Sequence, residues 1–417
     1  MNASNKRENP IGLLAECIGQ ELRTIARSRP ILLVMIGGVV FYGLLYNYMY
    51  APNLVRRAPV AVVDLSHTPL SREFIRLFAA APQVEVCARP ADMLGARELM
   101  KRNRTVGILY LPADFEERAG RGEQALFAAF GNTGTFLDFA AVQTAAAGAM
   151  QEIGAQLRPD MLHLLGPEAL YAVAQAPTAE AVGTVLFNPT EGYGSYLIPA
   201  VLMLILFQTL LMVIGSLAGG ERHDGSILRH GRYGTGFGAM ARVVAGKALA
   251  YCAVYAVFAY FLLGLLPEAF DIPAIGRWWE LVLLIVPYLL ATSFFGLTGA
   301  LFFTDSESPV LMIPFFSVGL IFLSGVSYPL ELIPWYWQAA HYALPAAPGV
   351  LAYVKINSMG ASLYDIRREY IVLWAQCAVY FLTACAVLRH NIRKARRSMP
   401  RTADPAPAAR TCGAEER

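Results

Sequence analysis

The chain has 417 residues, of which 56% are hydrophobic and 16% charged, and its mean hydropathy is +0.44. Soluble globular chains carry roughly 25% charged residues, so the composition indicates an integral membrane protein. The net charge of +3 is too small to suggest nucleic-acid binding. The six cysteines form no CxxC pair and no zinc-like spacing, so the sequence supports neither a disulfide framework nor a metal site.

Residues 1–30 precede the first apolar run and show no cleavable signal peptide. Apolar residues recur there at helical spacing, and Pro30 separates this pattern from the run that follows. We therefore predict an amphipathic helix that lies along the inner leaflet of the membrane. The alternative is an ordinary helix end that leads into the first span. The apolar face of the predicted helix consists of Ile11, Leu14, Ile18, Leu22 and Ile25.

About 20 apolar residues are needed to cross the hydrocarbon core of a membrane. Six segments satisfy this requirement, and they predict a six-span α-helical membrane protein. The predicted spans are 31–50, 196–217, 243–266, 280–303, 309–327 and 369–388.

The long interval 51–195 carries 15 acidic and 12 basic residues and must fold in water. Short β-like runs alternate in it with helical patterns, which predicts a mixed α/β domain whose sheet contains parallel pairs. The predicted strands are 59–65, 83–88, 105–111 and 124–130. The predicted helices are 70–80, 91–102, one that starts at Pro112, and 135–165.

Lysine and arginine residues gather before the first span, after the second and after the sixth. Cytoplasmic loops carry the excess of such residues, and an even number of spans puts all three clusters on one side. We therefore predict that both termini are cytoplasmic in a bacterial inner membrane and that the 51–195 domain is extracytoplasmic. Residues 218–242 form a cytoplasmic loop, and residues 389–417 form a basic tail that we expect to be disordered.

No motif in the chain indicates catalysis. The Gly246-Lys247 pair within 243–248 lacks the other residues of a phosphate-binding loop, and the glycines of 234–239 miss the dinucleotide spacing. We interpret both as flexible cytoplasmic loop. His223, Asp224 and His230 could be imagined as metal ligands, but a solvated loop is the simpler interpretation.

The centres of the spans contain no Asp, Glu, Arg or His, although such residues usually mark ion pathways. Glu280 stands at a span end, and Lys247 is expected to extend out of the third span toward water. This pattern argues against an ion-coupled pump, so energy for transport would have to come from a partner.

Four segments resemble the permease subunit of type 2 ABC exporters, in the branch with a large extracytoplasmic domain between the first two spans. The first two are "VAVVDLSHTPLSREFIRLFAA" (60–80) and "VGILYLPADFEERAGRGEQA" (106–125), which are similar to strands and helices of that domain. The third, "LFNPTEGYGSYLIPAV" (186–201), is like the re-entry into the second span. The fourth, "FLSGVSYPLELIPWYWQAAHYALP" (322–345), looks like the family's signature after the fifth span.

The resemblance implies that the loop after the second span inserts into a separate ABC ATPase subunit. ATP and magnesium would bind to that subunit, and this chain would bind no cofactor. The coupling residues would be Glu221, Arg222, His223, Asp224, Gly225 and Ser226, with Ser226 capping the next helix. Here the family's usual Arg-Glu-x-Glu-x-Gly-Thr motif is replaced by an acid–base run and Gly-Ser. A topology-setting solvated loop is the alternative.

The resemblance also implies an outer re-entrant segment, 328–360, that closes the pathway. Its gate residues would be Ser324, Gly325, Pro329, Leu330, Glu331, Pro334 and Trp335. A plain aromatic belt at the membrane surface is the alternative. Further partners implied are a second permease copy or a paralogue, membrane lipid, and a periplasmic adaptor with an outer-membrane channel.

The expected substrate is amphipathic, and a drug, a lipid or a peptide would fit the aromatic, neutral spans equally well. One rival hypothesis is a membrane-anchored sensor or scaffold whose α/β domain binds a ligand or partner outside. Another is a membrane-embedded enzyme, which the shortage of polar residues in the spans opposes.

Overall fold

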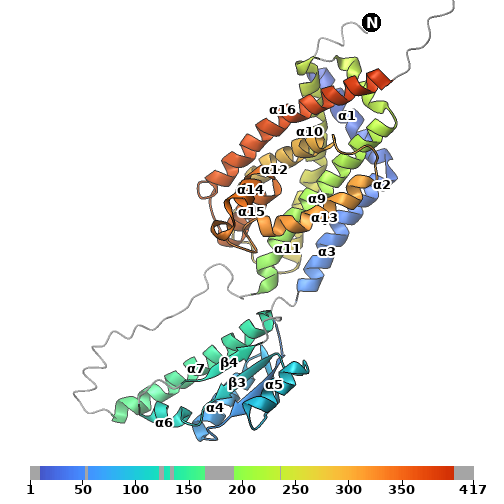
Figure 1. Ribbon diagram of the computed structural model, residues 1–417. Coiled ribbons are helices and arrows are strands. Elements are labelled where there is room, and N and C mark those ends of the chain that lie inside the picture. Colours follow the sequence, from blue (N-terminus) through green and yellow to red (C-terminus); the bar gives the residue numbers. More distant parts are fainter. Residues whose placement is uncertain are drawn as a thin grey trace, which may run out of the picture. The chain divides into compact units, whose positions relative to one another are not determined.

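The computed structural model describes residues 10–51, 55–121, 126–131, 136–164, 192–234 and 236–398 (Figure 1). The chain divides into two compact units. Unit 1 comprises Met1–Ala51 with Ser195–Arg417, and unit 2 is Pro52–Gly194. Predictions for residues 1–9 and 399–417 lie outside the described residues.

Unit 1 is helical. Its N-terminal part contains α1 (Pro10–Arg27), α2 (Arg29–Leu32), the π-helical turn η2 (Leu33–Gly37) and α3 (Gly38–Tyr50). The chain returns to this unit in α9 (Tyr193–His223), the 3-10 segment η3 (Ser226–Tyr233), α10 (Phe237–Tyr260), η4 (Phe261–Leu265) and α11 (Leu266–Ala269). It ends with α12 (Trp278–Gly299), α13 (Ser308–Leu323), η5 (Leu330–Leu332), α14 (Trp335–Ala343), α15 (Ala346–Met359) and α16 (Arg367–Ser398).

Five helical segments among the described residues are long and apolar enough to cross a membrane. They are Arg29–Tyr50, Tyr193–His223, Phe237–Ala269, Trp278–Gly299 and Arg367–Arg397. Each contains most or all of one predicted span. The fifth prediction, 309–327, falls on α13, which has 16 residues and ends at Leu323. A helix of this length measures about 24 Å, which is less than the roughly 30 Å of a hydrocarbon core.

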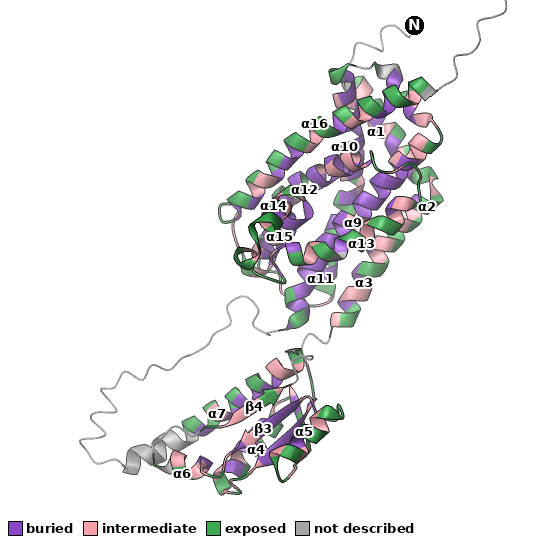
Figure 2. Cartoon of the chain, in the orientation of Figure 1, coloured by how far each residue is buried: buried purple, intermediate pink, exposed green. Residues whose placement is uncertain are grey.

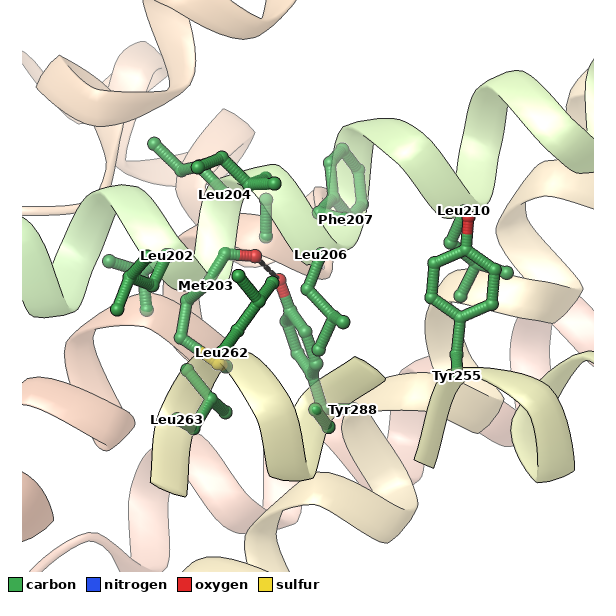
Figure 3. Packing of buried hydrophobic residues seen from close by; sticks show 14 of the residues in the cluster. Leu202, Met203, Leu204, Leu206, Phe207, Leu210, Tyr255, Leu262, Leu263 and Tyr288 are labelled. Atoms are coloured by element: carbon green, nitrogen blue, oxygen red, sulfur yellow. Dashed lines mark hydrogen bonds between the residues drawn. The ribbon is translucent and has the colours of Figure 1, made fainter. Parts of the chain in front are cut away.

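Helix α9 is the core of unit 1. In its most apolar stretch 83% of the residues are buried, compared with 28% in α16, and Figure 2 shows α9 buried along most of its length. The leucine-rich sequence of α9 is apolar on all sides, which is the pattern of a helix surrounded by others. Figure 3 shows Tyr288 of α12 beside Leu206, with its hydroxyl donating to the Met203 carbonyl at 2.9 Å.

The predicted disordered tail is wrong for its first ten residues. Helix α16 continues to Ser398, and Ile392 is fully buried against Ile227 and Leu228 of η3. The Arg396 guanidinium donates to the Gly231 carbonyl at 3.1 Å. Apolar and polar contacts with a distant segment therefore keep helical a stretch whose composition alone suggests a solvated tail.

Among its described residues, unit 2 contains a four-stranded sheet with three helices packed on it and one short helix beside them. The strands are β1 (Ala58–Asp64), β2 (Val84–Ala88), β3 (Gly107–Leu111) and β4 (Ala128–Gly131), in the order β2-β1-β3-β4. The pairs of β1 with β2 and β3 are parallel, as predicted, and β3 pairs with β4 in antiparallel orientation. The helices are α4 (Pro69–Ala80), α5 (Met93–Lys101), α6 (Phe115–Gly120) and α7 (Phe136–Leu164).

Both faces of the sheet are covered, which explains why β1 is apolar from Ala58 to Val63. Val60 and Val62 point into a core formed with α4 and α7, around Phe74. Ala61 and Val63 point to the opposite face and pack with Ala96 of α5. Successive side chains of a strand alternate between the two faces, so a strand buried on both sides needs apolar residues at every position.

Candidate coupling site and apolar cavity

Helix α9 extends beyond the end of the predicted second span. Gly219 and Gly220, which belong to the predicted loop 218–242, lie inside the helix. A Cβ at Gly219 would lie 1.9 Å from the Asp305 carbonyl oxygen, and one at Gly220 would lie 2.7 Å from Ser306 Oγ. These glycines therefore permit close contact between α9 and the connection from α12 to α13. The predicted loop 218–242 accordingly begins as helix.

Glu221 is turned into the protein. One of its carboxylate oxygens lies 2.8 Å from Lys247 Nζ and 3.1 Å from His230 Nε2. Lys247 belongs to α10 and His230 to η3. The interpretation of Glu221 as a residue of a solvated loop is therefore wrong, because its carboxylate is held between two basic groups that the tertiary structure brings to it.

Lys247 does not extend toward water as expected. Its side chain is buried, and Nζ also lies 3.0 Å from the Glu21 carboxylate of α1. The Tyr251 hydroxyl donates to Glu21 as well. We call these five side chains the buried polar cluster: Glu21, Glu221, His230, Lys247 and Tyr251. The cluster joins α1, α9, η3 and α10.

The sequence 243–248, interpreted above as flexible loop, is part of α10. A Cβ at Gly246 would lie 2.7 Å from Cys17 Cβ of α1, so the missing side chain allows the two helices to come close. This short separation is what lets Glu21, one helical turn after Cys17, reach Lys247. Gly246 therefore serves as a packing contact between two helices, and Lys247 is a buried cation.

Arg222, the next residue of α9, binds the end of α12. Its Nη1 donates to the carbonyls of Ala300, Leu301 and Phe303 at 2.9, 2.8 and 2.8 Å. These carbonyls follow the last turn of α12, where backbone acceptors lack helical partners and where a cation interacts favourably with the helix dipole. Arg222 therefore connects the ends of α9 and α12.

The remaining predicted coupling residues lie at the turn after α9. His223 and Asp224 are exposed, and Gly225 has a φ of 67°, in the left-handed region that favours glycine. Ser226 is the first residue of η3, and the prediction that it caps this segment is wrong. The N-cap of η3 is Gly225, and no side-chain capping bond is formed. Of the six predicted residues, His223 and Asp224 are the two that present charged or titratable side chains to the outside.

The predicted interfacial helix corresponds to α1, which packs along α10 (Figure 1). Ile25 is buried, whereas Leu14, Ile18 and Leu22 are half-buried. Ile11 lies in α1, but its side chain is outside the described set. The most buried positions also include Cys17 and Glu21, which the apolar pattern missed. A lysine inside an apolar run was the signal that a buried acid should exist somewhere in the chain.

Replacing Lys247 with methionine should destabilise unit 1, because it leaves Glu21 and Glu221 buried with one cation fewer. Breaking a buried ion pair by removing one partner costs about 3–5 kcal/mol. Thermal unfolding of the purified full-length protein would measure the effect, with the exposed Lys101→Met as control. A triple variant, Glu21→Gln, Glu221→Gln and Lys247→Met, should recover part of the loss. Equal melting temperatures for Lys247→Met and the control would contradict the assignment.

The predicted outer gate begins where α13 stops. Ser324 is buried and donates to the Ile321 carbonyl at 2.6 Å, and Gly325 has a φ of 82°. Leu330 is half-buried, whereas Pro329, Glu331 and Pro334 are exposed, and Trp335 is 79% exposed. Residues 328–360 form three short helices, of which α15 is the most buried.

His341 of α14 forms a hydrogen bond with the last residue of α13. Its Nδ1 lies 2.8 Å from the Leu323 carbonyl, and because a carbonyl only accepts, this nitrogen carries the hydrogen. Nε2 is buried and has no partner among the described residues. Burial lowers the pKa of His341 below its ordinary value of 6.5. The hydrogen bond to the Leu323 carbonyl and the charge of Glu369 oppose this shift, and the charges of Arg368 and Lys355 add to it.

The lowered pKa of His341 predicts a loss of stability in acid. The unfolded chain binds the proton more tightly than the folded one, so stability is complete above about pH 6.5 and declines as the pH falls below it. His341→Gln keeps a donor for Leu323 and should show a smaller drop in melting temperature between pH 7.5 and 5.5. His390→Gln, an exposed control, should follow the unmodified protein. An identical pH profile for all three proteins would refute this role.

A cavity of about 1000 Å³ lies among α9, α12, α13 and α14. Its wall is formed mainly by aromatic and aliphatic side chains, among them Phe207, Phe295, Phe316 and Trp337. Its side-chain hydroxyls come from four residues: Thr298, Ser317, Ser327 and Tyr328. Cavities that bind small molecules have this size and this predominantly apolar lining. The predicted gate region contributes Tyr328, Ile333 and Trp337 to this wall.

Comparison with known proteins identifies the family. Residues 29–386 match the family described as "ABC-2 family transporter protein". A search of curated proteins and a search of solved structures gave no match. The match covers the spans, unit 2, the turn after α9 and the cavity. The chain therefore belongs to the ABC-2 transporter family and is a multi-pass permease of an ABC transporter.

Proposed function

We propose that this chain is the membrane-spanning subunit of an ATP-driven exporter that moves an amphipathic substrate out of the cytoplasm or the inner leaflet. The apolar cavity among α9, α12, α13 and α14 is the observation that carries this proposal. Its apolar wall suits the hydrocarbon or aromatic part of a drug, lipid or peptide. Its few hydroxyls can orient a polar group without introducing a charge into the spans.

In this proposal the chain hydrolyses no ATP and binds no cofactor, and a separate ATPase subunit holds ATP and magnesium. The termini and the turn after α9 are cytoplasmic in a bacterial inner membrane, and unit 2 is extracytoplasmic. Segment 309–327, which contains α13 and the turn after it, completes six crossings. Residues 328–360 form the outer re-entrant gate. The working transporter contains two permease copies or paralogues, and an adaptor and an outer-membrane channel are further partners.

The cavity can be tested at Gly319, which contributes to its wall. A Cβ at Gly319 would meet no atom within 4 Å, so a larger side chain should enter the cavity without disturbing the packing. We expect Gly319→Leu to reduce export of the amphipathic dye Hoechst 33342 and of a fluorescent short-chain phospholipid, relative to protein level in the membrane.

Gly37→Leu is the matched control, because Gly37 is also in a helical segment with free space around it but contributes nothing to this cavity. Export by Gly319→Leu equal to that of Gly37→Leu would place the substrate path elsewhere. Reduced amounts of both proteins in the membrane would instead reveal a folding effect, which the comparison separates from transport.

The exposed turn after α9 is the proposed contact with the ATPase. Replacing His223 and Asp224 together by alanine should leave folding intact, because both side chains are exposed. Copurification of the ATPase should fall and should become more sensitive to salt. Exposed ion pairs contribute about 0.2–1 kcal/mol each, and more where an interface excludes water.

Glu268→Ala serves as control for this test. Glu268 is exposed in α11, at the far end of the next candidate span, Phe237–Ala269. The double variant should lose export in proportion to the ATPase it fails to retain, whereas Glu268→Ala should lose neither. If the double variant retains both the ATPase and export, the turn does not couple the subunits.

A further inference from the structure

Unit 2 contains a concave groove with a volume of about 850 Å³. It lies at the carboxyl ends of β1 and β2, which are parallel neighbours and therefore end at the same edge of the sheet. One wall follows α4 through Arg72, Ile75 and Arg76 to Ala79 and Ala80. The segment after β2, Arg89-Pro90-Ala91, also lines the groove, and we call Val62, Asp64 and His67 its floor.

The groove is basic although unit 2 as a whole contains more acidic than basic residues. Three arginines line it against a single carboxylate, that of Asp64. The Asp64 oxygens are occupied by the protein itself. Oδ1 accepts from the backbone amides of Ser66 and His67 at 3.0 and 3.1 Å, and Oδ2 accepts from Ser71 Oγ at 2.9 Å.

The arginines differ in how much of their binding capacity is used. Arg76 is paired with the Glu73 carboxylate, and one Arg72 nitrogen donates to the His67 carbonyl at 3.1 Å. That bond uses one of the five N–H donors of the Arg72 guanidinium and leaves the others available in the groove. The Arg89 guanidinium has no hydrogen-bond or ion-pair partner within the described part of the chain. Arg72 and Arg89, both in the lining of the groove, therefore offer positive charge that no carboxylate compensates among the described residues.

The turn that forms the floor is pre-organised. Asp64 closes it through the two backbone amides, and Thr68 and Ser71 form a reciprocal capping box at the start of α4. This arrangement holds His67 at a φ of 52°, a conformation that residues other than glycine adopt uncommonly. Backbone held in such a region is found where the surrounding structure determines it strongly, as at ligand sites.

We propose that this groove binds an amphiphilic organic anion. The phosphate or carboxylate group would lie between Arg72 and Arg89, since guanidinium groups form paired, charge-assisted hydrogen bonds with such groups. The apolar part would lie along Ile75, Ala79, Ala80 and Pro90. The volume exceeds what a bare inorganic anion fills and is within the range of sites for small organic ligands. The same chemistry is offered by a free anion and by the headgroup region of an acidic phospholipid.

Titration of the full-length protein in detergent with phenyl phosphate would test the groove, with binding followed by ligand-observed NMR. We expect Arg89→Gln to weaken binding about tenfold, the effect of losing a hydrogen bond to a charged group, and Arg89→Lys to weaken it less. Arg97→Gln makes the same charge change at an exposed position of α5, and it should leave the affinity for phenyl phosphate unchanged. Inorganic phosphate and phenol should each bind more weakly than phenyl phosphate.

The proposal is overturned if phenyl phosphate does not bind, or if Arg89→Gln and Arg97→Gln have equal effects. It is also overturned if inorganic phosphate or phenol binds as tightly as phenyl phosphate. Repeating the titration in phosphatidylcholine and phosphatidylglycerol nanodiscs distinguishes the two sources of the ligand. Competition by phosphatidylglycerol that disappears in Arg89→Gln identifies a lipid headgroup, and equal affinity in both discs identifies a free anion. Neither result depends on export or on the ATPase.

Discussion

Lys247 is buried between the carboxylates of Glu21 and Glu221, and the arrangement of unit 1 depends on this contact. Transferring three charges out of water is costly, and their mutual attraction offsets the cost only while all three stay together with His230 and Tyr251. The N-terminal helix, the end of α9, η3 and the start of α10 must therefore keep their relative positions. A shift of any one of these elements by a few ångströms would leave a charge buried without a partner.

This constraint gives the turn after α9 a rigid support. On one side Glu221 is held by the buried polar cluster, and on the other Arg222 binds the carbonyls at the end of α12. Segment η3, which follows the turn, is covered by Ile392 and Arg396 of α16. A displacement of His223 and Asp224 would consequently be transmitted through charged and hydrogen-bonded contacts. These contacts lead to α1, α10, α12 and α16. Among these, α12 also forms part of the wall of the apolar cavity.

Unit 2 uses charge in a different way. Its core is formed by the alternating apolar residues of β1 and β3 between α4 and α7 on one face and α5 on the other. At the end of β1, Asp64 accepts hydrogen bonds that fix the turn after the strand. Arginines from α4 and from the end of β2 line the groove beside this turn. A buried cluster in which the charges compensate one another holds a structure together, whereas exposed and incompletely compensated charge is available for a ligand.

The local pattern of the chain was sufficient to predict most of the elements. Runs of about 20 apolar residues indicated five of the helices that are long enough to span a membrane. Short runs that were either apolar or alternating located the strands of unit 2 to within a few residues. The break at Ser28 between α1 and α2 was also visible in the sequence, since proline is favoured in the first turn of a helix and Pro30 lies in the first turn of α2. The positive φ of Gly225 also agreed with its position in a turn.

What only the tertiary structure decided is which polar residues meet. Glu221 looked like an exposed loop residue because its partner Lys247 lies 26 positions away in the chain. Glu21, which shares Lys247 with it, lies 200 positions away. Gly246-Lys247 looked like a loop because neither the packing of α1 against α10 nor the buried acids can be read from neighbouring residues. Residues 389–398 looked like a tail because η3, which buries Ile392, is distant in sequence. Apolar periodicity is a local property of a chain, whereas the partner of a buried charge is set by long-range packing, and the sequence by itself determines only the first.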